Sequence, residues 1–358
     1  MPIPVVQLGT GNVGVHALKA LITNPAFELT GVWVSSEAKA GKDAAELAGL
    51  TDSTGVLATT DLDAVLATGP RCAVYNALAD NRLPEALEDY RRVLSAGINI
   101  VGSGPVFLQY PWQVIPENLI SPLEDAAREG NSSLYVNGID PGFANDLLPL
   151  ALAGTCQSIQ QIRCMEIVDY ATYDSAAVMF EVMGFGKPLD DIPMLLQPGV
   201  LSLAWGSVVR QLAAGLGVEL DEVTQTHERV PAPEDFDIAS GHVPEGGAAA
   251  LRFEVLGMVD GHPAVVLEHV TRLREDLCPE WPQPAQPGGS YRIEITGEPS
   301  YAVDVCLGSR VGDHNHAGLV ATAMRVVNAI PAVVAAPAGI VTTLDLPLVP
   351  GRGLYAPG

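Results

Sequence analysis

Three glycines near the start of the chain, Gly9, Gly11 and Gly14, have the spacing G-x-G-x-x-G. A short apolar run precedes them, and a stretch of helical character at residues 15–22 follows. In such a turn the first glycine permits a tight bend, the second lets backbone approach a pyrophosphate, and the third lets helix and strand pack closely. The helix N-terminus then binds the phosphate charge. The segment therefore predicts a dinucleotide site formed by Gly9, Thr10, Gly11, Asn12, Val13 and Gly14.

The next predicted strand, residues 29–34, bears on which dinucleotide is bound. An acidic residue at its end would hold the ribose 2′-hydroxyl of NAD. Here the strand ends in Ser35 and Ser36, and Lys39 follows. Hydroxyl and ammonium groups donate to a 2′-phosphate without repelling it. We therefore expect NADP(H) to be preferred, with NAD(H) as the alternative because Glu37 could turn towards a ribose.

Alternating strands and helices over the first 136 residues predict an α/β, Rossmann-type, doubly wound parallel sheet. Further strands are expected at residues 55–59, 72–76, 98–102 and 133–136, and helices at 61–66, 84–96 and 116–129. Ligands of such sheets bind beyond the carboxyl ends of the strands. Asn76, Ala77, Gly102 and Asn137 lie there, either as cofactor contacts or as ordinary turn residues.

From about residue 159 the pattern changes to that of an antiparallel sheet. Strands are expected at 159–168, 249–259, 264–273, 291–295 and 301–305, and helices at 201–216 and 317–328. The two central strands should form a hairpin that turns at Asp260-Gly261. Residues 230–247, rich in Pro, Gly and Asp, are expected to be a long irregular insertion that serves as a lid or a subunit contact.

Composition limits the classes of partner. A chain of 358 residues with 48% hydrophobic residues can form two domains with substantial cores. Apolar residues do not gather in a run of 18 or more, and no basic leader precedes the first strand, so a cytoplasmic protein is expected. A net charge of −23 would repel phosphates and anionic lipid, which argues against nucleic acid or membrane partners.

Cysteine and histidine usage gives no sign of a metal site. The five cysteines form no C-x-x-C pair and are expected to be reduced. His314-Asn315-His316 has no cysteine or acidic cluster of zinc-like spacing beside it, so no metal is expected.

Six segments spread along the chain carry a more specific signal. They are Gly9-Thr10-Gly11-Asn12-Val13-Gly14, Val32-Trp33-Val34-Ser35, Gly41-Lys42-Asp43-Ala44, Gly138-Ile139-Asp140-Pro141-Gly142-Phe143, Met183-Gly184-Phe185-Gly186-Lys187 and Asn328-Ala329-Ile330-Pro331. Together they resemble the native amine dehydrogenases, close to the 2,4-diaminopentanoate dehydrogenases and often labelled dihydrodipicolinate-reductase-like.

The resemblance implies a domain organisation and an assembly. It implies a dinucleotide-binding domain at 1–140, a central α+β substrate and dimerisation domain at 141–310, and a segment at 311–358 that returns a helix to the first domain. It also adds Asn328 to the residues expected at the cofactor and implies a homodimer.

The resemblance further implies reversible reductive amination of a small ketone or aldehyde with ammonia. Such a reaction must deprotonate ammonium, protonate departing water and tolerate a cationic iminium, and one carboxylate can serve all three needs. In the family a glutamate just after the fifth strand usually does so. Residues 102–112 keep Tyr110-Pro111-Trp112 but contain no acid. Three alternatives remain open. Another acid substitutes for the glutamate, or water and ammonia react with polar guidance alone, or the reaction is not an amination. In the last case the protein is an ammonia-independent carbonyl or imine reductase, or a non-catalytic NADP(H)-binding sensor.

Three residues are candidates for the missing acid–base function. Asp140 follows the sixth strand and either faces the cofactor or forms a turn before Pro141. Glu166 lies on an apolar strand and is a proton carrier if it faces inward, but only a solvated residue if it faces outward. Tyr173 could hydrogen-bond the carbonyl oxygen or stack on an iminium, or it is a core tyrosine.

An apolar wall is expected around the substrate. Phe143, Met179, Phe180 and Met183 lie where the family has its substrate pocket, although each could instead pack in the core. Such a wall favours an aliphatic carbonyl compound over an amino acid. Arg163 and Arg210 are the nearby residues that could still clamp a carboxylate.

Overall fold

The computed structural model describes residues 1–79 and 82–355, and the chain divides into two compact units. The first unit contains Met1–Ile139 and Leu319–Gly358, and the second contains Asp140–Gly318. The chain therefore passes from the first unit to the second directly before Asp140. The second falls inside helix α9 (His314–Val334), later than the expected bound at residue 310.

The first unit is built on a seven-stranded sheet in the order β15-β6-β5-β4-β1-β2-β3. Every strand pairing in it is parallel, which confirms the Rossmann-type fold. Its strands are β1 (Ile3–Leu8), β2 (Phe27–Trp33), β3 (Ala58–Thr59), β4 (Cys72–Tyr75), β5 (Asn99–Gly102), β6 (Ser133–Val136) and β15 (Gly339–Ile340). Its helices are α1 (Asn12–Thr23), α2 (Ala44–Leu47), α3 (Leu62–Leu66), α4 (Leu83–Ser95) and α5 (Glu117–Gly130), besides most of α9.

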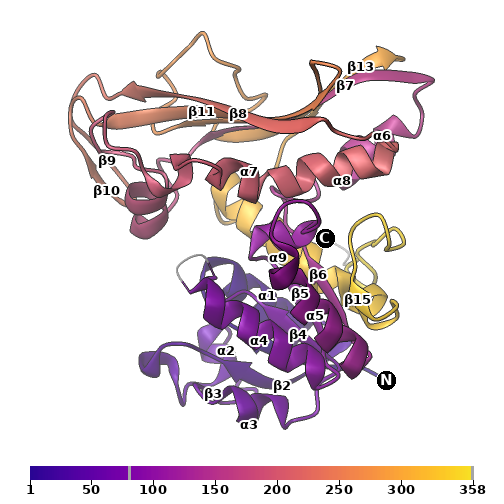
Figure 1. Ribbon diagram of the computed structural model, residues 1–358. Coiled ribbons are helices and arrows are strands. Elements are labelled where there is room, and N and C mark those ends of the chain that lie inside the picture. Colours follow the sequence, from indigo (N-terminus) through magenta and orange to yellow (C-terminus); the bar gives the residue numbers. More distant parts are fainter. Residues whose placement is uncertain (80–81, 356–358) are drawn as a thin grey trace. The chain divides into compact units, whose positions relative to one another are not determined.

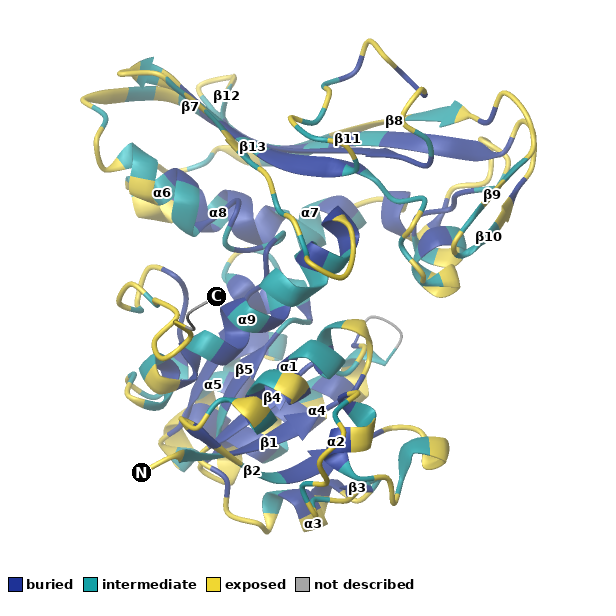
Figure 2. Ribbon diagram, turned by 180° about the vertical axis from the view of Figure 1, so that it is seen from behind, coloured by how far each residue is buried: buried dark blue, intermediate teal, exposed yellow. Residues whose placement is uncertain are grey.

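Helices cover both faces of this sheet because the strands are apolar on both sides. On one face, α1 and α9 share a buried core with Val5, Val74 and Val101. On the other, Tyr90 of α4 packs against Tyr75 of β4 with ring centroids 4.6 Å apart. Figure 2 shows the central strands as buried.

Strand β3 is shorter than the expected 55–59. The Asp43 carboxylate accepts hydrogen bonds from the backbone N–H groups of Ala45, Thr54 and Gly55. These bonds tie residues 53–55 into a loop, so only Ala58 and Thr59 remain to pair with β2.

Helix α9 extends beyond its expected end at Asn328 and includes Pro331. The last two turns bury Ala329, Ile330 and Val333 in the core of the first unit, and this burial outweighs the backbone hydrogen bond that the proline removes. By length and composition alone, α9 could cross a membrane. Its buried face in the core is typical of an interior helix of a folded domain.

The second unit is built on a six-stranded sheet in the order β14-β13-β7-β12-β11-β8. Its strands are β7 (Ser158–Asp169), β8 (Glu222–Pro231), β11 (Ala248–Val259), β12 (His262–Arg272), β13 (Gly289–Glu298) and β14 (Tyr301–Val305). The hairpin at Asp260-Gly261 is present. However, β7 and β12 run parallel, so the expectation of a purely antiparallel sheet was wrong.

Helices α6 (Leu147–Ala153), α7 (Val200–Ala204) and α8 (Gly206–Leu216) lie along one face of this sheet (Figure 1). The expected single helix at 201–216 is thus two helices that meet at Trp205. Short turns of helix occupy η1 (Glu37–Lys39) and η2 (Val106–Gln109) in the first unit, and η3 (Ala177–Val182) and η4 (Met194–Leu196) in the second. The η3 segment is a π-helix.

Residues 230–247 are not the irregular insertion that was expected. Strand β8 continues to Pro231, and β9 (Phe236–Ile238) pairs with β10 (Gly241–Val243) as a small antiparallel hairpin. Gly241 has φ +142° and lies under the Phe180 ring, where a Cβ would come within 3.1 Å of the ring. Gly241 therefore lets this hairpin pack on η3.

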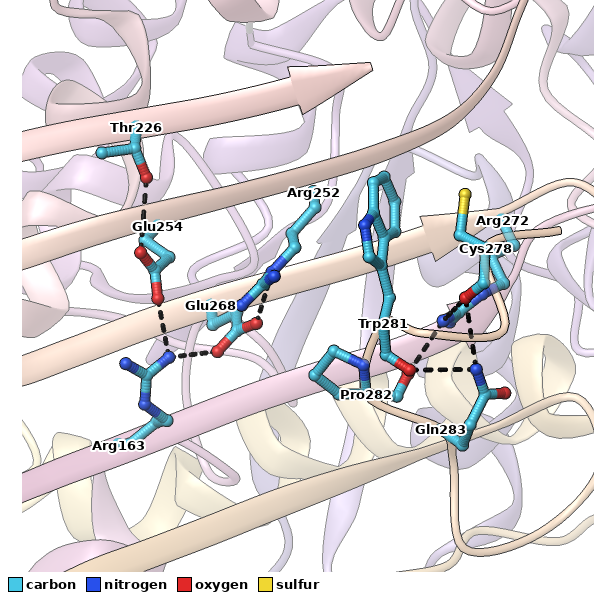
Figure 3. Close-up of polar contacts among 10 residues, drawn as sticks. All are labelled: Arg163, Thr226, Arg252, Glu254, Glu268, Arg272, Cys278, Trp281, Pro282 and Gln283. Atoms are coloured by element: carbon cyan, nitrogen blue, oxygen red, sulfur yellow. Dashed lines mark hydrogen bonds and ion pairs between the residues drawn. The ribbon is translucent and has the colours of Figure 1, made fainter. Parts of the chain in front are cut away.

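The opposite face of the second sheet carries a charged network (Figure 3). Arg163 bonds both Glu254 and Glu268, and Arg252 Nε donates to Glu268 Oε1 over 2.8 Å. The two arginines and two glutamates sum to zero charge. Further along the same face, the Arg272 guanidinium donates to the backbone carbonyls of Leu277, Cys278 and Pro282, in a loop that covers the end of the sheet.

Candidate active site

The three glycines of the turn in the first unit differ in how closely they are packed. Gly9 has φ +93°, and a Cβ there would lie 2.5 Å from the Ala77 nitrogen. A Cβ on Gly14 would lie 2.3 Å from the Gly9 oxygen, so helix and strand meet at this point. Around Gly11, by contrast, a Cβ would meet no described atom within 4 Å. Gly9 and Gly14 therefore satisfy packing, while Gly11 faces open space where a ligand can approach.

Lys39 lies at this turn, next to the two serines at the end of β2. Its ammonium donates to the Thr10 carbonyl over 2.8 Å and contacts the Thr10 hydroxyl at 3.1 Å. Ser35 and Ser36 are exposed. Glu37 is turned towards Thr60, whose hydroxyl donates to Glu37 Oε1 over 3.2 Å. The groups beyond β2 thus place a cation, and not the carboxylate, beside the glycine turn.

Other expected cofactor residues have clear structural partners. Asn76 accepts from Gln7 and donates to Ser103, which ties together the ends of β1, β4 and β5. Gly102 is small for a packing reason, because a Cβ there would lie 2.7 Å from the Tyr90 hydroxyl. Asn137 is 1% exposed and accepts a bond of 2.9 Å from Arg325 Nε of α9. Asn328 lies half-buried on α9.

Asp140, Glu166 and His269 form a buried cluster in the second unit. His269 Nε2 lies 3.2 Å from Asp140 Oδ1, and Nδ1 lies 3.0 Å from Glu166 Oε2. The three side chains are 3 to 8% exposed. Glu166 therefore faces inward, and Asp140 does more than form a turn. The structure brings together two of the three predicted acid–base residues through a histidine that was not predicted.

The sheet itself sets this geometry. His269 on β12 is directly opposite Glu166 on β7, and Tyr291 on β13 is opposite Glu166 on its other side. Phe253 on β11 completes the row as the partner of His269. Residues paired across a sheet point to the same face. One row across four strands therefore presents Tyr291, Glu166, His269 and Phe253 to the helix-covered side.

Aromatic side chains enclose the cluster. Trp205, at the junction of α7 and α8, donates from Nε1 to Asp140 Oδ1 over 3.1 Å. Tyr170 donates to Glu166 Oε2 over 3.2 Å, and Tyr291 also hydrogen-bonds Glu166. Burial, and then the negative charge of Glu166, raise the pKa of both tyrosines well above the usual value, so both remain donors.

The electrostatics of the cluster favour a cation. Burial alone would lower the pKa of His269, but Asp140 and Glu166 outweigh burial and raise this pKa to about 10. With His269 protonated and both acids ionised, the cluster has one net negative charge. A buried site with that charge stabilises an ammonium or iminium group and disfavours an anion.

The same three side chains also have the spacing of a possible metal site, since their ligand atoms lie within 4.8 Å of one another. Each ring nitrogen of His269, however, faces a different carboxylate. An ion shared by both acids could bind only one of these nitrogens and would have to break the other contact. The absence of a metal therefore stays a prediction, and the geometry fits a hydrogen-bonded ion cluster.

The remaining predicted site residues lie elsewhere in the second unit. Tyr173 is half-buried and stacks on Tyr170 with ring centroids 5.3 Å apart. Met179 and Met183 are 0% and 7% exposed and belong to the main core of the unit, as the packing alternative anticipated. Phe143 and Phe180 are half-buried.

Comparison with known proteins identifies the family. A family model, the 2,4-diaminopentanoate dehydrogenase C-terminal domain, matches residues 143–352. An amine dehydrogenase from Streptomyces virginiae is 41% identical over 356 residues, which is 98% of each chain. The chain belongs to this family of amine and diaminopentanoate dehydrogenases. The expected resemblance is confirmed, and with it the expectation of an enzyme of the dehydrogenase class.

More distant members of the family agree. A 2,4-diaminopentanoate dehydrogenase from Acetoanaerobium sticklandii is 25% identical over 275 residues, covering 75% of this chain and 72% of that protein. The structure of an amine dehydrogenase from Mycobacterium smegmatis has the same fold, with a TM-score of 0.80 at 22% identity over 99% of both chains.

Proposed function

We propose that this protein is an NAD(P)H-dependent amine dehydrogenase that aminates a small ketone or aldehyde with ammonia and catalyses the reverse oxidative deamination. The observation that carries the proposal is the buried, negatively charged cluster of Asp140, Glu166 and His269 in a chain of this family. When bound, the nicotinamide cofactor would supply hydride to the iminium carbon. The open space at Gly11 between two tightly packed glycines fits its pyrophosphate.

The two carboxylates would do the work of the glutamate missing after the fifth strand. Glu166 accepts a proton from ammonium, and the ammonia so formed adds to the carbonyl carbon to give a carbinolamine. The same proton then returns to the hydroxyl group, which leaves as water. The resulting iminium carries one positive charge, which the net charge of the cluster offsets. Asp140 contributes the second negative charge, and hydride addition to the iminium carbon completes the amine.

Tyr173 would help to place the carbonyl compound. It stacks on Tyr170, which bonds Glu166, so one side chain links its ring to the acid cluster. Aromatic faces attract cations, and a phenol can donate to a carbonyl oxygen. We therefore assign Tyr173 to orientation of the substrate.

The proposed substrate is uncharged and aliphatic. Arg163, a candidate clamp for a carboxylate, lies on the opposite face of the sheet from Glu166 and is bound to Glu254 and Glu268. Phe143 and Phe180 are half-buried and could provide apolar contact, whereas Met179 and Met183 would act behind them as core. The net negative charge of the cluster further opposes a carboxylate substrate.

NADP(H) is the proposed cofactor. Lys39 at the glycine turn and the exposed Ser35 and Ser36 offer donors to a 2′-phosphate. Glu37 is engaged with Thr60, which weakens the case for a carboxylate that binds the ribose of NAD.

A homodimer and a cytoplasmic location are also proposed. Two copies of a chain with net charge −23 repel each other over most of their surfaces. The repulsion is weaker at the network of Arg163, Arg252, Glu254 and Glu268, because its charges sum to zero. The five cysteines are free, which suits a reducing compartment. Light scattering of the purified protein, and cell fractionation, would test the two points.

The activity is tested by a panel of small ketones and aldehydes with NADPH, each with and without ammonium at alkaline pH. We expect NADPH oxidation that requires both carbonyl and ammonium. A rate independent of ammonium would indicate a carbonyl or imine reductase, and tight NADPH binding without turnover on any compound would indicate a sensor.

A further inference from the structure

We propose that His269 is a positioning residue that holds Asp140 and Glu166 ionised around one shared imidazolium. This inference rests on the proposed amine dehydrogenase function, because it explains how two acids can be used in a buried site. It also assigns a role to a residue that lies outside the chemistry of the amination itself.

With both acids ionised, the two contacts of the ring require a donor at each ring nitrogen. Nδ1 faces Glu166 Oε2 at 3.0 Å and Nε2 faces Asp140 Oδ1 at 3.2 Å. A neutral imidazole has only one N–H, so in that form a lone pair would face a carboxylate oxygen. The doubly protonated ring donates to both acids and satisfies both contacts.

Without that cation the two acids would be difficult to keep charged. Asp140 is 3% and Glu166 8% exposed in their side chains, and burying two carboxylates without a counter-charge is costly. Carboxylates that lack a cation in such a site take up a proton and share it. His269 supplies that counter-charge, so Glu166 can act as a base.

The other groups around the cluster are neutral or negatively charged, so His269 is its cation. From β13 and the start of α9 come Tyr291 and His314, whose rings lie 5.6 Å apart. Burial lowers the pKa of His314, so it stays neutral. Tyr170 remains a protonated donor, and on the Asp140 side burial raises the pKa of Cys164 well above its usual value.

Four further residues lie around the cluster. Asp146, at the start of α6, adds a negative charge near Cys164 and is bonded by Gln211 of α8. Trp205 and Phe253 are uncharged rings against the imidazole, and His227 on β8 is the exposed strand partner of Phe253.

The direct test is the charge of His269 in the folded protein. Nitrogen NMR of imidazole-labelled protein should show His269 doubly protonated at about pH 8, two units below its pKa of about 10. A neutral His269 at that pH would overturn the proposal. This measurement needs no turnover, so it stands or falls separately from the amination assay.

The functional test compares His269→Gln with His262→Gln, an exposed histidine at the start of the same strand. His269→Gln should add a proton-dependent step to the pH profile of kcat, with a roughly tenfold or larger loss on its acid side. The cofactor KM should not change. His262→Gln should retain the wild-type profile. An unchanged profile in His269→Gln would contradict the proposal.

A variant that keeps the histidine covers the case in which His269→Gln does not fold. In Glu166→Gln one acid is replaced by a neutral amide, so the imidazolium loses one of its two partners. The NMR titration of His269 should then move to lower pH by one unit or more. A titration midpoint equal to that of the wild type would show that the acids do not hold the proton.

Discussion

The imidazole of His269 lies flat against the ring of Phe253, with centroids 4.7 Å apart and 9° between the planes. Phe253 is 1% exposed. A charged imidazolium over an aromatic face gains from cation–π attraction in addition to packing.

This contact predicts energetic coupling. Phe253→Leu should lower the free energy of unfolding by about 1–3 kcal/mol, because a buried ring is lost. In a double-mutant cycle with His269→Gln, urea unfolding should give a coupling energy of about 0.5–1.5 kcal/mol. If the losses of unfolding free energy in the two single variants add to that of the double variant within about 0.3 kcal/mol, the stacking contributes nothing beyond burial.

Stability should decline at alkaline pH because of His269. Its pKa is about 10 in the folded protein against 6.5 for an unperturbed histidine. A raised folded pKa gives stabilisation that is complete below pH 6.5 and is lost as pH rises through about 10. Unfolding free energies measured between these values should fall more steeply for the wild type than for His269→Gln. Parallel slopes would argue against a protonated histidine.

The glycine turn separates packing from ligand binding. Gly11→Ala should change the unfolding free energy by less than about 0.5 kcal/mol, since the new Cβ meets open space. It should nevertheless weaken NADPH binding at least about tenfold, because the Cβ occupies the approach of the pyrophosphate. Gly14→Ala is the matched variant, with a Cβ 2.3 Å from the Gly9 oxygen, and should destabilise the fold itself. Calorimetry of binding and unfolding distinguishes the two. Unweakened binding by Gly11→Ala would place the cofactor elsewhere.

Lys39 should discriminate between the two dinucleotides. Lys39→Ala removes a cation at the turn and should raise the KM for NADPH about tenfold while leaving that for NADH nearly unchanged. Lys42→Ala is the control, because Lys42 is exposed and pairs with Glu46. Equal losses for both cofactors would assign Lys39 to the structure of the turn.

Glu166 and Tyr173 should affect turnover more than cofactor binding. Glu166→Gln should reduce kcat by about a hundredfold or more, because an amide cannot accept the proton of ammonium. Tyr173→Phe should have a smaller effect, of about tenfold, since only an orienting hydroxyl is lost. The KM for NADPH should be unchanged in both variants. If kcat were unaltered in both, these residues would lie outside the site.

Local signals in the sequence were sufficient for much of the fold. The glycine turn, the alternating elements of the first unit and the hairpin at Asp260-Gly261 each depend on short-range spacing, and they are found as predicted. The end of α9 was misplaced because burial of Ile330 and Val333 overrode a local proline signal.

His269, the residue of the cluster that was not predicted, depends on contacts between segments far apart in the sequence. Glu166 and His269 lie in segments about a hundred residues apart in the chain, and they meet because β7 and β12 run parallel. No local pattern reports that pairing. The one available signal was a run of polar side chains, Glu268, His269, Thr271 and Arg272, within an otherwise apolar strand. Buried polar residues of this kind need partners, but the sequence does not say which.

The cluster can form only after β13, β7, β12 and β11 have paired during folding, because its row of residues spans all four strands. Its members come from four strands, and the central parallel pair must close a large loop before Glu166 meets its histidine. An incompletely folded chain would carry the acids but lack their common cation. Recovery of the His269 imidazolium signal upon refolding would therefore serve as an intrinsic reporter of a correctly registered sheet.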